Sequence, residues 1–129
     1  MMSLWGMYHV VYETPGDPLI SIVIPNKDHI DDLKRCISSI VEKSAYTNYE
    51  IIIVENNSEE LNTFRYYQEL QAQYPVIKVV EWEKAFNYSA INNYGVSFAR
   101  GNYLLFLNND TELISPGAIQ EMLGHCMRE

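Results

Sequence analysis

The sequence predicts an α/β fold in which a mostly parallel sheet is covered by helices on both faces. Two observations lead to this fold class. Short β-branched apolar runs alternate with segments of helical periodicity in the order β-α-β-α-β-α-β-α, and polar clusters directly follow three of the apolar runs. Such alternation is typical of parallel sheets with right-handed crossovers. With 129 residues, 47% of them hydrophobic and 20% charged, the chain can form one compact domain with its own core.

The first predicted strand covers residues 19–24, a run rich in isoleucine, and the polar residues 25–28 end it. A helix follows, with Asp28 as its predicted N-cap, because short oxygen-bearing side chains favour that position. Apolar residues then recur at helical spacing, namely Ile30, Leu33, Ile37, Ile40 and Val41.

The second predicted strand covers residues 49–54 and ends in the polar cluster 55–58. Residues 59–73 have helical periodicity, and Pro75 follows because proline cannot continue a helix. Residues 76–82 form the third predicted strand. This segment therefore supplies two more parallel strands joined by one crossover helix.

Residues 87–100 are predicted to form the next helix, which stops at Gly101 because glycine commonly ends helices. Residues 102–107 are the fourth strand, a continuous apolar run after Asn102. Ser115 and Pro116 are predicted to open a last helix, as its N-cap and first helical residue.

Residues 1–18 are predicted to be an irregular linker or N-terminal extension, since residues 14–18 are dense in turn formers. The aromatic and apolar residues before that turn are expected to pack either on this domain or on a neighbour. They are Trp5, Met7, Tyr8, Val10, Val11 and Tyr12.

The charge balance limits the classes of partner. A net charge of -8 argues against nucleic-acid binding, which usually needs a basic face. No apolar run approaches the roughly 20 residues that span a bilayer, so direct membrane insertion is not expected. Residues 1–7 do not resemble a signal peptide. Cys36 and Cys126 lie outside any metal-binding pattern, and a reducing cytosol is the simplest interpretation of two thiols.

Polar clusters follow three predicted strands, at residues 25–28, 55–58 and 108–110. The carboxyl ends of parallel strands meet at one edge of a sheet, where ligands of such folds bind. Asp110 is thus placed to hold a hard cation and, through it, a phosphate; an Asn/Asp turn is the alternative. Neither GxGxxG nor GxxxxGK[ST] occurs, so phosphate binding would need Mg²⁺ or Mn²⁺. His29 either approaches this ligand or is a solvent-exposed residue of the first helical turn.

Four ordered blocks, at residues 21–28, 52–58, 86–93 and 105–112, resemble family-2 glycosyltransferases with the GT-A fold, a Rossmann-like architecture. The resemblance is closest to bacterial enzymes that build surface polysaccharides, including rhamnosyltransferase-like members. It implies that residues 19–129 bind a nucleotide-diphospho-sugar. Hexosyl or rhamnosyl transfer to the hydroxyl of a glycan or lipid-linked acceptor would follow, in an inverting, metal-dependent reaction. The implied location is the cytoplasm, including the inner face of the membrane.

The resemblance also implies roles for single residues. The nucleotide-binding positions would be Pro25, Asn26, Asp28, Glu55, Asn57, Asn87, Asn93 and Asn109. Glu55 stands where the family usually has an aspartate that contacts the base. Asp110 and Asn108 match the DXD motif and would hold Mn²⁺ or Mg²⁺. Asn108 replaces the first acid and brings an oxygen without a charge.

The family's general base comes from a region after the DXD strand, and the chain ends about twenty residues past Asp110. The acceptor half and the base are therefore expected to lie outside this chain. The alternative function is a non-catalytic nucleotide-sugar-binding or interaction module, inactive as this fragment. A nucleotidyltransferase is disfavoured because residues 25–28 do not form a glycine-rich basic loop. Exposed sheet edges and apolar surface predict a homo-oligomer.

Overall fold

The computed structural model describes residues 5–9 and 18–127, which form one five-stranded sheet with helices on both faces. The strands are β1 (Trp5–His9), β2 (Ile20–Asn26), β3 (Tyr49–Glu55), β4 (Ile77–Glu81) and β5 (Tyr103–Leu107). The helices are α1 (Ile30–Ser38), which continues as the π-helical turn η1 (Ser39–Lys43), α2 (Leu61–Gln73), α3 (Tyr88–Val96) and α4 (Ala118–Met127).

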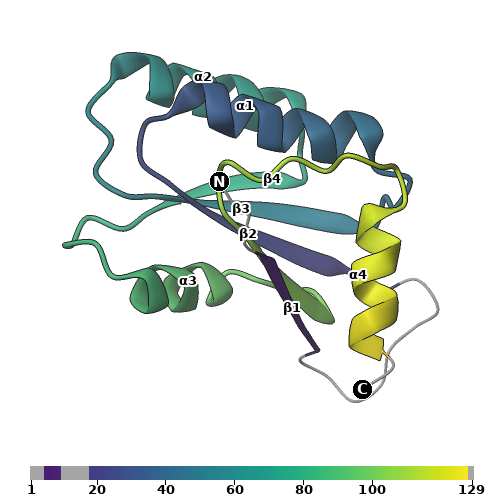
Figure 1. Cartoon of the computed structure of the whole chain (residues 1–129). Coiled ribbons are helices and arrows are strands. Elements are labelled where there is room, and N and C mark those ends of the chain that lie inside the picture. Colours follow the sequence, from purple (N-terminus) through teal and green to yellow (C-terminus); the bar gives the residue numbers. More distant parts are fainter. Residues whose placement is uncertain (1–4, 10–17, 128–129) are drawn as a thin grey trace.

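The sheet has the strand order β1-β5-β2-β3-β4. Strands β5, β2, β3 and β4 run parallel, with Ile22 opposite both Ile51 and Leu105. Helices α1 and α2 cover one face, and α3 covers the other (Figure 1). The predicted fold class, a mostly parallel sheet between helices, is confirmed.

The prediction that residues 1–18 are irregular was wrong for Trp5–His9. These residues form strand β1, which pairs antiparallel with β5 along its full length, Trp5 opposite Leu107 and His9 opposite Tyr103. The pairing covers an edge of β5 that would otherwise leave backbone groups unpaired. Met7 packs against the core of this domain. Of the rest of the predicted linker, residues 1–4 and 10–17 lie outside the described residues, and Pro18 is buried.

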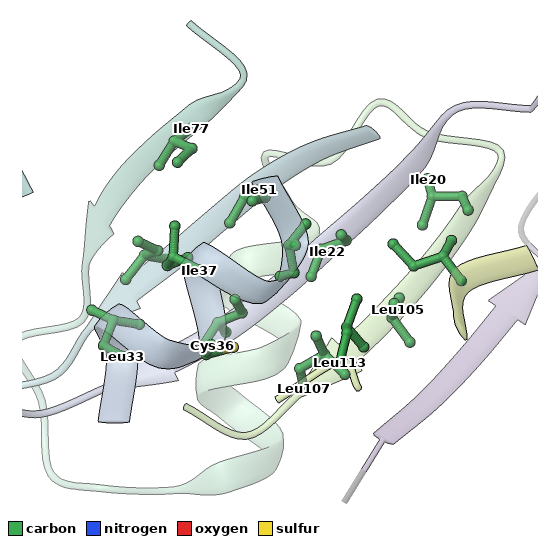
Figure 2. Packing of buried hydrophobic residues seen from close by; sticks show 14 of the residues in the cluster. Ile20, Ile22, Leu33, Cys36, Ile37, Ile51, Ile77, Leu105, Leu107 and Leu113 are labelled. Atoms are coloured by element: carbon green, nitrogen blue, oxygen red, sulfur yellow. The ribbon is translucent and has the colours of Figure 1, made fainter. Parts of the chain in front are cut away.

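Two apolar clusters hold the helices to the sheet. Side chains alternate along β2, so Ile20, Ile22 and Ile24 face α1 and α2, whereas Val23 faces α3. The larger cluster, drawn in Figure 2, also receives Leu113 from the segment after β5. Its members from the strands are almost fully inaccessible to solvent.

Gly95 of helix α3 faces the sheet and packs against Val23 and Val54. A Cβ at Gly95 would lie 2.7 Å from Cγ1 of Val23 and 2.9 Å from Cγ2 of Val54. These distances are shorter than real Cβ contacts, so any side chain at this position would force α3 or the two valines to shift. The helix also ends at Val96, four residues before the predicted end, because the chain then turns toward β5.

Other predicted boundaries are close to the observed ones. Helix α2 begins at Leu61 rather than residue 59, and the last helix begins at Ala118 rather than Pro116. In the described part of the chain, no helix is both long and apolar enough to cross a membrane.

Candidate functional site

A cavity of about 640 Å³ opens at the carboxyl edge of the sheet, where β2, β3 and β5 end. The residues that line it come from all three polar clusters predicted from the sequence and from the loop before α3. They are Pro25, Asn26, Lys27, Asp28, His29, Asn56, Phe86, Tyr88, Asn108, Asn109 and Asp110. Parallel pairing of the three strands is what brings these distant segments together.

A chain of hydrogen bonds joins the three strand ends beneath the cavity. Nδ2 of Asn109 donates to Oδ1 of Asn26 at 2.8 Å, and Nδ2 of Asn26 donates to the hydroxyl of Tyr67 at 2.9 Å. That hydroxyl donates in turn to Oε1 of Glu55 at 2.8 Å. Asn26 and Glu55 are 3% and 4% exposed, so the chain is shielded from water and holds the cavity floor in one arrangement.

Glu55 lies below the cavity instead of lining it. Its Oε2 accepts a hydrogen bond from the backbone N–H of Ser58 at 2.6 Å, and its Oε1 accepts from the hydroxyls of Ser58 and Tyr67. Burial, together with the carboxylate of Glu55, raises the pKa of Tyr67 above its usual range. Both carboxylate oxygens of Glu55 are therefore committed to shaping the loop after β3.

Asp28 does not cap α1, contrary to the prediction. The residue before α1 is His29, and both Asp28 and His29 have positive φ angles, 52° and 48°. The carboxylate of Asp28 reaches across to the start of α2, where it accepts hydrogen bonds from the backbone N–H groups of Glu59 and Glu60 and from the hydroxyl of Thr63. Desolvation raises its pKa, but these hydrogen bonds outweigh it and the net pKa is lowered.

Asn57 holds the loop that forms one wall of the cavity. It has a φ of 57°, a left-handed conformation that asparagine tolerates better than most residues. Its Nδ2 donates to the carbonyl of Lys84 at 2.9 Å. The neighbouring Asn56 donates to the carbonyls of Lys84 and Trp82, each at 3.2 Å. This loop presents Phe86, whose side chain is 68% exposed.

Asn87 and Asn93 do not line this cavity. Asn87 is the N-cap of α3, and its Oδ1 accepts a hydrogen bond from the backbone N–H of Ala90 at 3.0 Å. Asn93 is exposed further along α3 and lines a smaller neighbouring cavity. The structure therefore gives Asn87 a capping role and places Asn93 away from the strand ends.

Asp110 has an oxygen that lacks a partner. Within the described residues, its Oδ1 is buried and makes no hydrogen bond. The pKa of the Cys36 thiol is raised to about 12, mainly by burial and also by the nearby charge of Asp110, so this thiol stays neutral. Because an unpaired buried oxygen is costly, Asp110 is suited to a bound cation.

The loop that carries Asp110 is fixed from both sides. The backbone N–H of Thr111 donates to the carbonyl of Asn108 at 3.0 Å, closing a turn. The backbone N–H of Leu113 donates to Oγ of Ser39 at 2.9 Å, inside the core. Asp110 is thus held at the cavity by a turn on one side and a buried anchor on the other. The Asn/Asp turn that was the alternative to a metal site is therefore present. The two interpretations do not exclude each other, because the turn places the Asp110 carboxylate at the cavity.

The ligand set suits an ion that also binds a substrate phosphate. Among the described residues, no group of three or more His, Cys, Asp or Glu side chains could hold a metal. Mg²⁺ commonly uses one or two carboxylates together with phosphate oxygens and water. Asp110 and the amide oxygen of Asn108 fit that pattern. Lys27 is the only lysine or arginine among the lining residues described, so little protein charge is available to an anion.

Residues 21–129 match the model of the family named glycosyl transferase family 2. The chain belongs to this family. This family-2 chain is 36% identical over 121 residues to the O-antigen biosynthesis protein RfbC of Myxococcus xanthus. It is 34% identical over 121 residues to the uncharacterized protein y4gI of Sinorhizobium fredii. The alignments cover 94% of this chain but only 9% and 13% of those two proteins.

Solved structures share the fold of this family-2 chain at low sequence identity. A mannosyltransferase from Pyrobaculum calidifontis, in complex with GDP-Man and Mn²⁺, superposes with a TM-score of 0.72 at 16% identity, over 86% of this chain and 33% of that one. TarS from S. aureus, in complex with UDP-GlcNAc, gives 0.69 at 16% identity, over 84% and 31%. The fold is therefore that of GT-A glycosyltransferases, as the resemblance implied.

In this family-2 domain, six of the ten residues predicted for the site line the cavity. They are Pro25, Asn26, Asp28, Asn108, Asn109 and Asp110. Glu55, Asn57 and Asn87 lie in supporting positions, and Asn93 lines the smaller cavity. Phe86 and Tyr88 also line the cavity but were not predicted as site residues. The signal for them in the sequence was a pair of aromatic residues between the end of a strand and the start of a helix.

Proposed function

We propose that this chain is the donor-binding part of a glycosyltransferase. The enzyme transfers a hexosyl or rhamnosyl group from a nucleotide-diphospho-sugar to an acceptor hydroxyl, in cell-surface polysaccharide synthesis. The observation that carries the proposal concerns Oδ1 of Asp110, which has no hydrogen-bond partner among the described residues and lies at a cavity where three parallel strands end. Family membership and the similarity to an O-antigen biosynthesis protein support the reaction and the pathway.

The diphosphate would bind beside Asp110 through Mn²⁺ or Mg²⁺, with Asn108 as a second oxygen ligand. The metal supplies positive charge that stabilises the leaving nucleoside diphosphate. Asn109 and Asn26 fix the floor below it through their 2.8 Å hydrogen bond. The similar mannosyltransferase in complex with GDP-Man and Mn²⁺ supports this arrangement.

The nucleotide base would lie against the loop before α3. Phe86 and Tyr88 line the cavity with side chains that are 68% and 45% exposed, which leaves aromatic faces free for stacking. Asn57 contributes indirectly, since its hydrogen bond to Lys84 holds this loop. Pro25, near the end of β2, forms a rigid part of the cavity wall. Glu55 supports the site from below.

The transfer we propose is an inverting displacement, in which a base removes the proton of the acceptor hydroxyl. We assign that base to no residue of this chain. The acceptor would be a glycan or a lipid-linked glycan, met in the cytoplasm or at the inner face of the membrane. The free thiol of Cys36 is compatible with such a reducing compartment.

Calorimetry with UDP-, GDP- and dTDP-sugars, with and without Mn²⁺, tests the proposal. We expect one nucleotide class to bind, and to bind more tightly with Mn²⁺. Asp110→Asn should abolish the Mn²⁺ effect, whereas Glu112→Gln, a change at an exposed acid two residues away, should not. If no nucleotide binds the folded chain, or if the Mn²⁺ effect survives Asp110→Asn, the proposal is wrong.

A non-catalytic nucleotide-sugar-binding module is the second candidate, favoured by the amide at Asn108 where the DXD motif has an acid. Incubation of the bound donor with the chain separates the two functions. Release of nucleoside diphosphate in a metal-dependent manner supports an enzyme. Persistent binding without release supports a binding module.

A further inference from the structure

The buried hydrogen-bond chain beneath the cavity has a fixed direction. It runs from Asn109 through Asn26 and Tyr67 to Glu55, with donor–acceptor distances of 2.8, 2.9 and 2.8 Å. Asn26, Tyr67 and Glu55 are each at least 96% buried, so water does not compete for these bonds. An amide between two partners donates with its nitrogen and accepts with its oxygen, and a hydroxyl has one proton to donate. The group at one end of the chain therefore sets the orientation of all the others.

Glu55 sets this direction, because a carboxylate can only accept hydrogen bonds. The hydroxyl of Tyr67 donates its proton to Oε1 of Glu55 and must therefore accept from Asn26. This turns the amide nitrogen of Asn26 toward Tyr67 and its amide oxygen toward Asn109. Asn109 must then turn its own nitrogen toward Asn26. The orientation of the Asn109 amide thus follows from a carboxylate three hydrogen bonds away.

The consequence of this direction is felt inside the cavity. Because Nδ2 of Asn109 is bonded to Asn26, Oδ1 is the part of this amide left for a ligand, and it makes no hydrogen bond among the described residues. Asn109 lines the cavity within the same turn that carries Asp110. An amide oxygen attracts a cation, whereas an amide NH₂ group in its place would repel one. The direction of the chain therefore decides which charge this part of the cavity favours.

We propose that Glu55 and Tyr67 are positioning residues, which hold the Asn109 amide with its oxygen toward a divalent cation at Asp110. Neither is among the described residues that line the cavity, so each acts on the ligand through Asn26 and Asn109. The orientation of the amide stands on the hydrogen bonds alone. The choice of a divalent cation as its ligand rests on the proposed function.

Glu55→Gln is the decisive variant, because it keeps the shape of the side chain and should reverse the hydrogen-bond chain. Oε2 of Glu55 accepts from the backbone N–H of Ser58, a group that can only donate. The new amide oxygen must take that place, which puts its NH₂ group at the position of Oε1. There it meets the hydroxyls of Tyr67 and Ser58, and both can accept. Tyr67 then donates to Asn26, each asparagine amide turns over, and the NH₂ group of Asn109 faces the ligand.

Side-chain amide NMR of the full chain reads this reversal without any ligand. In the unaltered chain we expect nuclear Overhauser effects between the NH₂ protons of Asn26 and the ring of Tyr67. In Glu55→Gln these should disappear, and the same protons should show effects to Asn109 instead. Circular dichroism confirms that each variant is folded.

Titration with Mn²⁺ alone, followed by the EPR signal of the free ion, measures the effect on the cation. Residues that orient metal ligands typically change metal affinity by about 10–100-fold when they are altered. Glu55→Gln should therefore bind Mn²⁺ about tenfold or more weakly than the unaltered chain. Tyr67→Phe cuts the chain and leaves both orientations of Asn109 accessible, so it should weaken Mn²⁺ binding by a smaller factor.

Glu81→Gln is the matched control for the loss of charge. Glu81 lies opposite Glu55 on the neighbouring strand and is exposed, so this change removes the same charge and leaves the chain intact. Exposed charges are well screened, and Mn²⁺ affinity should stay within about twofold. If Glu81→Gln weakens Mn²⁺ binding as much as Glu55→Gln does, the effect is one of net charge and the proposal is wrong.

Three other results overturn the proposal. They are a folded, unaltered chain that binds no Mn²⁺, a Glu55→Gln variant that binds Mn²⁺ normally, and Asn26 protons that stay close to Tyr67 in that variant. If Glu55→Gln does not fold, Tyr67→Phe decides, and unchanged Mn²⁺ affinity in it overturns the proposal. The proposed function fails separately. If no nucleotide binds while Mn²⁺ affinity falls in Glu55→Gln, the positioning role stands without the donor.

Discussion

The hydroxyl of Tyr67 accepts a hydrogen bond from Nδ2 of Asn26 at 2.9 Å, and this contact ties helix α2 to the end of β2. The same hydroxyl donates to Glu55 at the end of β3. One helical residue thus bridges two strand ends, and Asn26 extends the connection to Asn109 at the end of β5. The site is therefore supported by a tyrosine outside every polar strand-end cluster.

Tyr67→Phe should destabilise the fold by about 1–3 kcal/mol, because it removes one partner each from the buried side chains of Asn26 and Glu55. Urea unfolding followed by circular dichroism measures the change. Tyr66→Phe is the matched control. This change keeps the ring on which the Lys34 ammonium lies, 5.4 Å from the centroid, so it should change stability by less than about 0.5 kcal/mol. Equal effects of the two changes would contradict a bridging role for Tyr67.

Asp110→Asn should leave the metal-free protein as stable as before, or raise its unfolding free energy by up to about 1 kcal/mol. The reason is that Oδ1 of Asp110 is buried and has no partner in the described part of the chain, so burying its charge lowers the stability of the fold. Thermal unfolding in EDTA and in Mn²⁺ with a nucleotide-sugar measures both states. A ligand at 100 times its Kd stabilises by about 2.7 kcal/mol, and this gain should vanish in the variant.

A large loss of stability for Asp110→Asn in EDTA would have a different meaning. It would show that the carboxylate supports the fold rather than a ligand. Glu112→Gln serves as the control, since Glu112 is exposed and its 3.3 Å ion pair with Lys43 lies on the surface. Surface pairs of this kind contribute little, so its unfolding temperature should change only slightly.

Because the pKa of Asp28 is lowered in the folded chain, we expect the chain to lose stability in acid. Its folded pKa lies below the ordinary value of 3.8, so its contribution is fully present above that pH and is lost as the pH falls through the folded pKa. Asp28→Asn should therefore be less stable than the unaltered chain near neutral pH, and the difference should shrink below pH 3.8. Urea unfolding at several pH values tests the sign. A difference that grows in acid would contradict it.

Much of this fold could be predicted because its signals are local. Buried strands such as β2 and β3 are continuous apolar runs, and α1 shows helical spacing directly in the sequence. Strand β1 carries no such signal. It is short and contains Gly6, and it becomes a strand only because β5, nearly a hundred residues away, offers a free edge.

The same distinction applies to the site. Asp110 could be predicted because it directly follows an apolar strand. The roles of Asp28 and Glu55 could not, since each depends on a partner in or before α2 that only the folded chain brings near. A carboxylate after a strand is available for ligands or for the protein's own backbone, and the sequence does not distinguish these uses.

Self-association is expected from the outer edges of β1 and β4, the two edge strands of the sheet. Unpaired strand edges readily pair with another chain. Exposed apolar side chains add to this tendency, Ile114 being 89% exposed. Light scattering over a range of concentrations should show a mass that rises above 15.0 kDa. A constant monomer mass at high concentration would contradict the expectation.

Gly95→Ala should destabilise the domain by about 1–3 kcal/mol, the usual cost of overpacking. The new methyl group would overlap Val23 and Val54, at 2.7 and 2.9 Å, so α3 would have to move away from the sheet. Gly124→Ala is the control in α4, where a Cβ meets no atom within 4 Å. Helical propensity should make that change stabilising by about 0.5–1 kcal/mol.

The displacement of α3 should also alter the cavity at the strand ends, because Tyr88 at the start of α3 lines it. Nucleotide affinity should therefore fall in folded Gly95→Ala, as it should in Phe86→Ala, whereas Gly124→Ala should leave it unchanged. Calorimetry on the three variants provides the comparison. If Gly95→Ala loses stability but binds the nucleotide normally, α3 adjusts without moving Tyr88, and the cavity does not depend on the packing of Gly95 against the sheet.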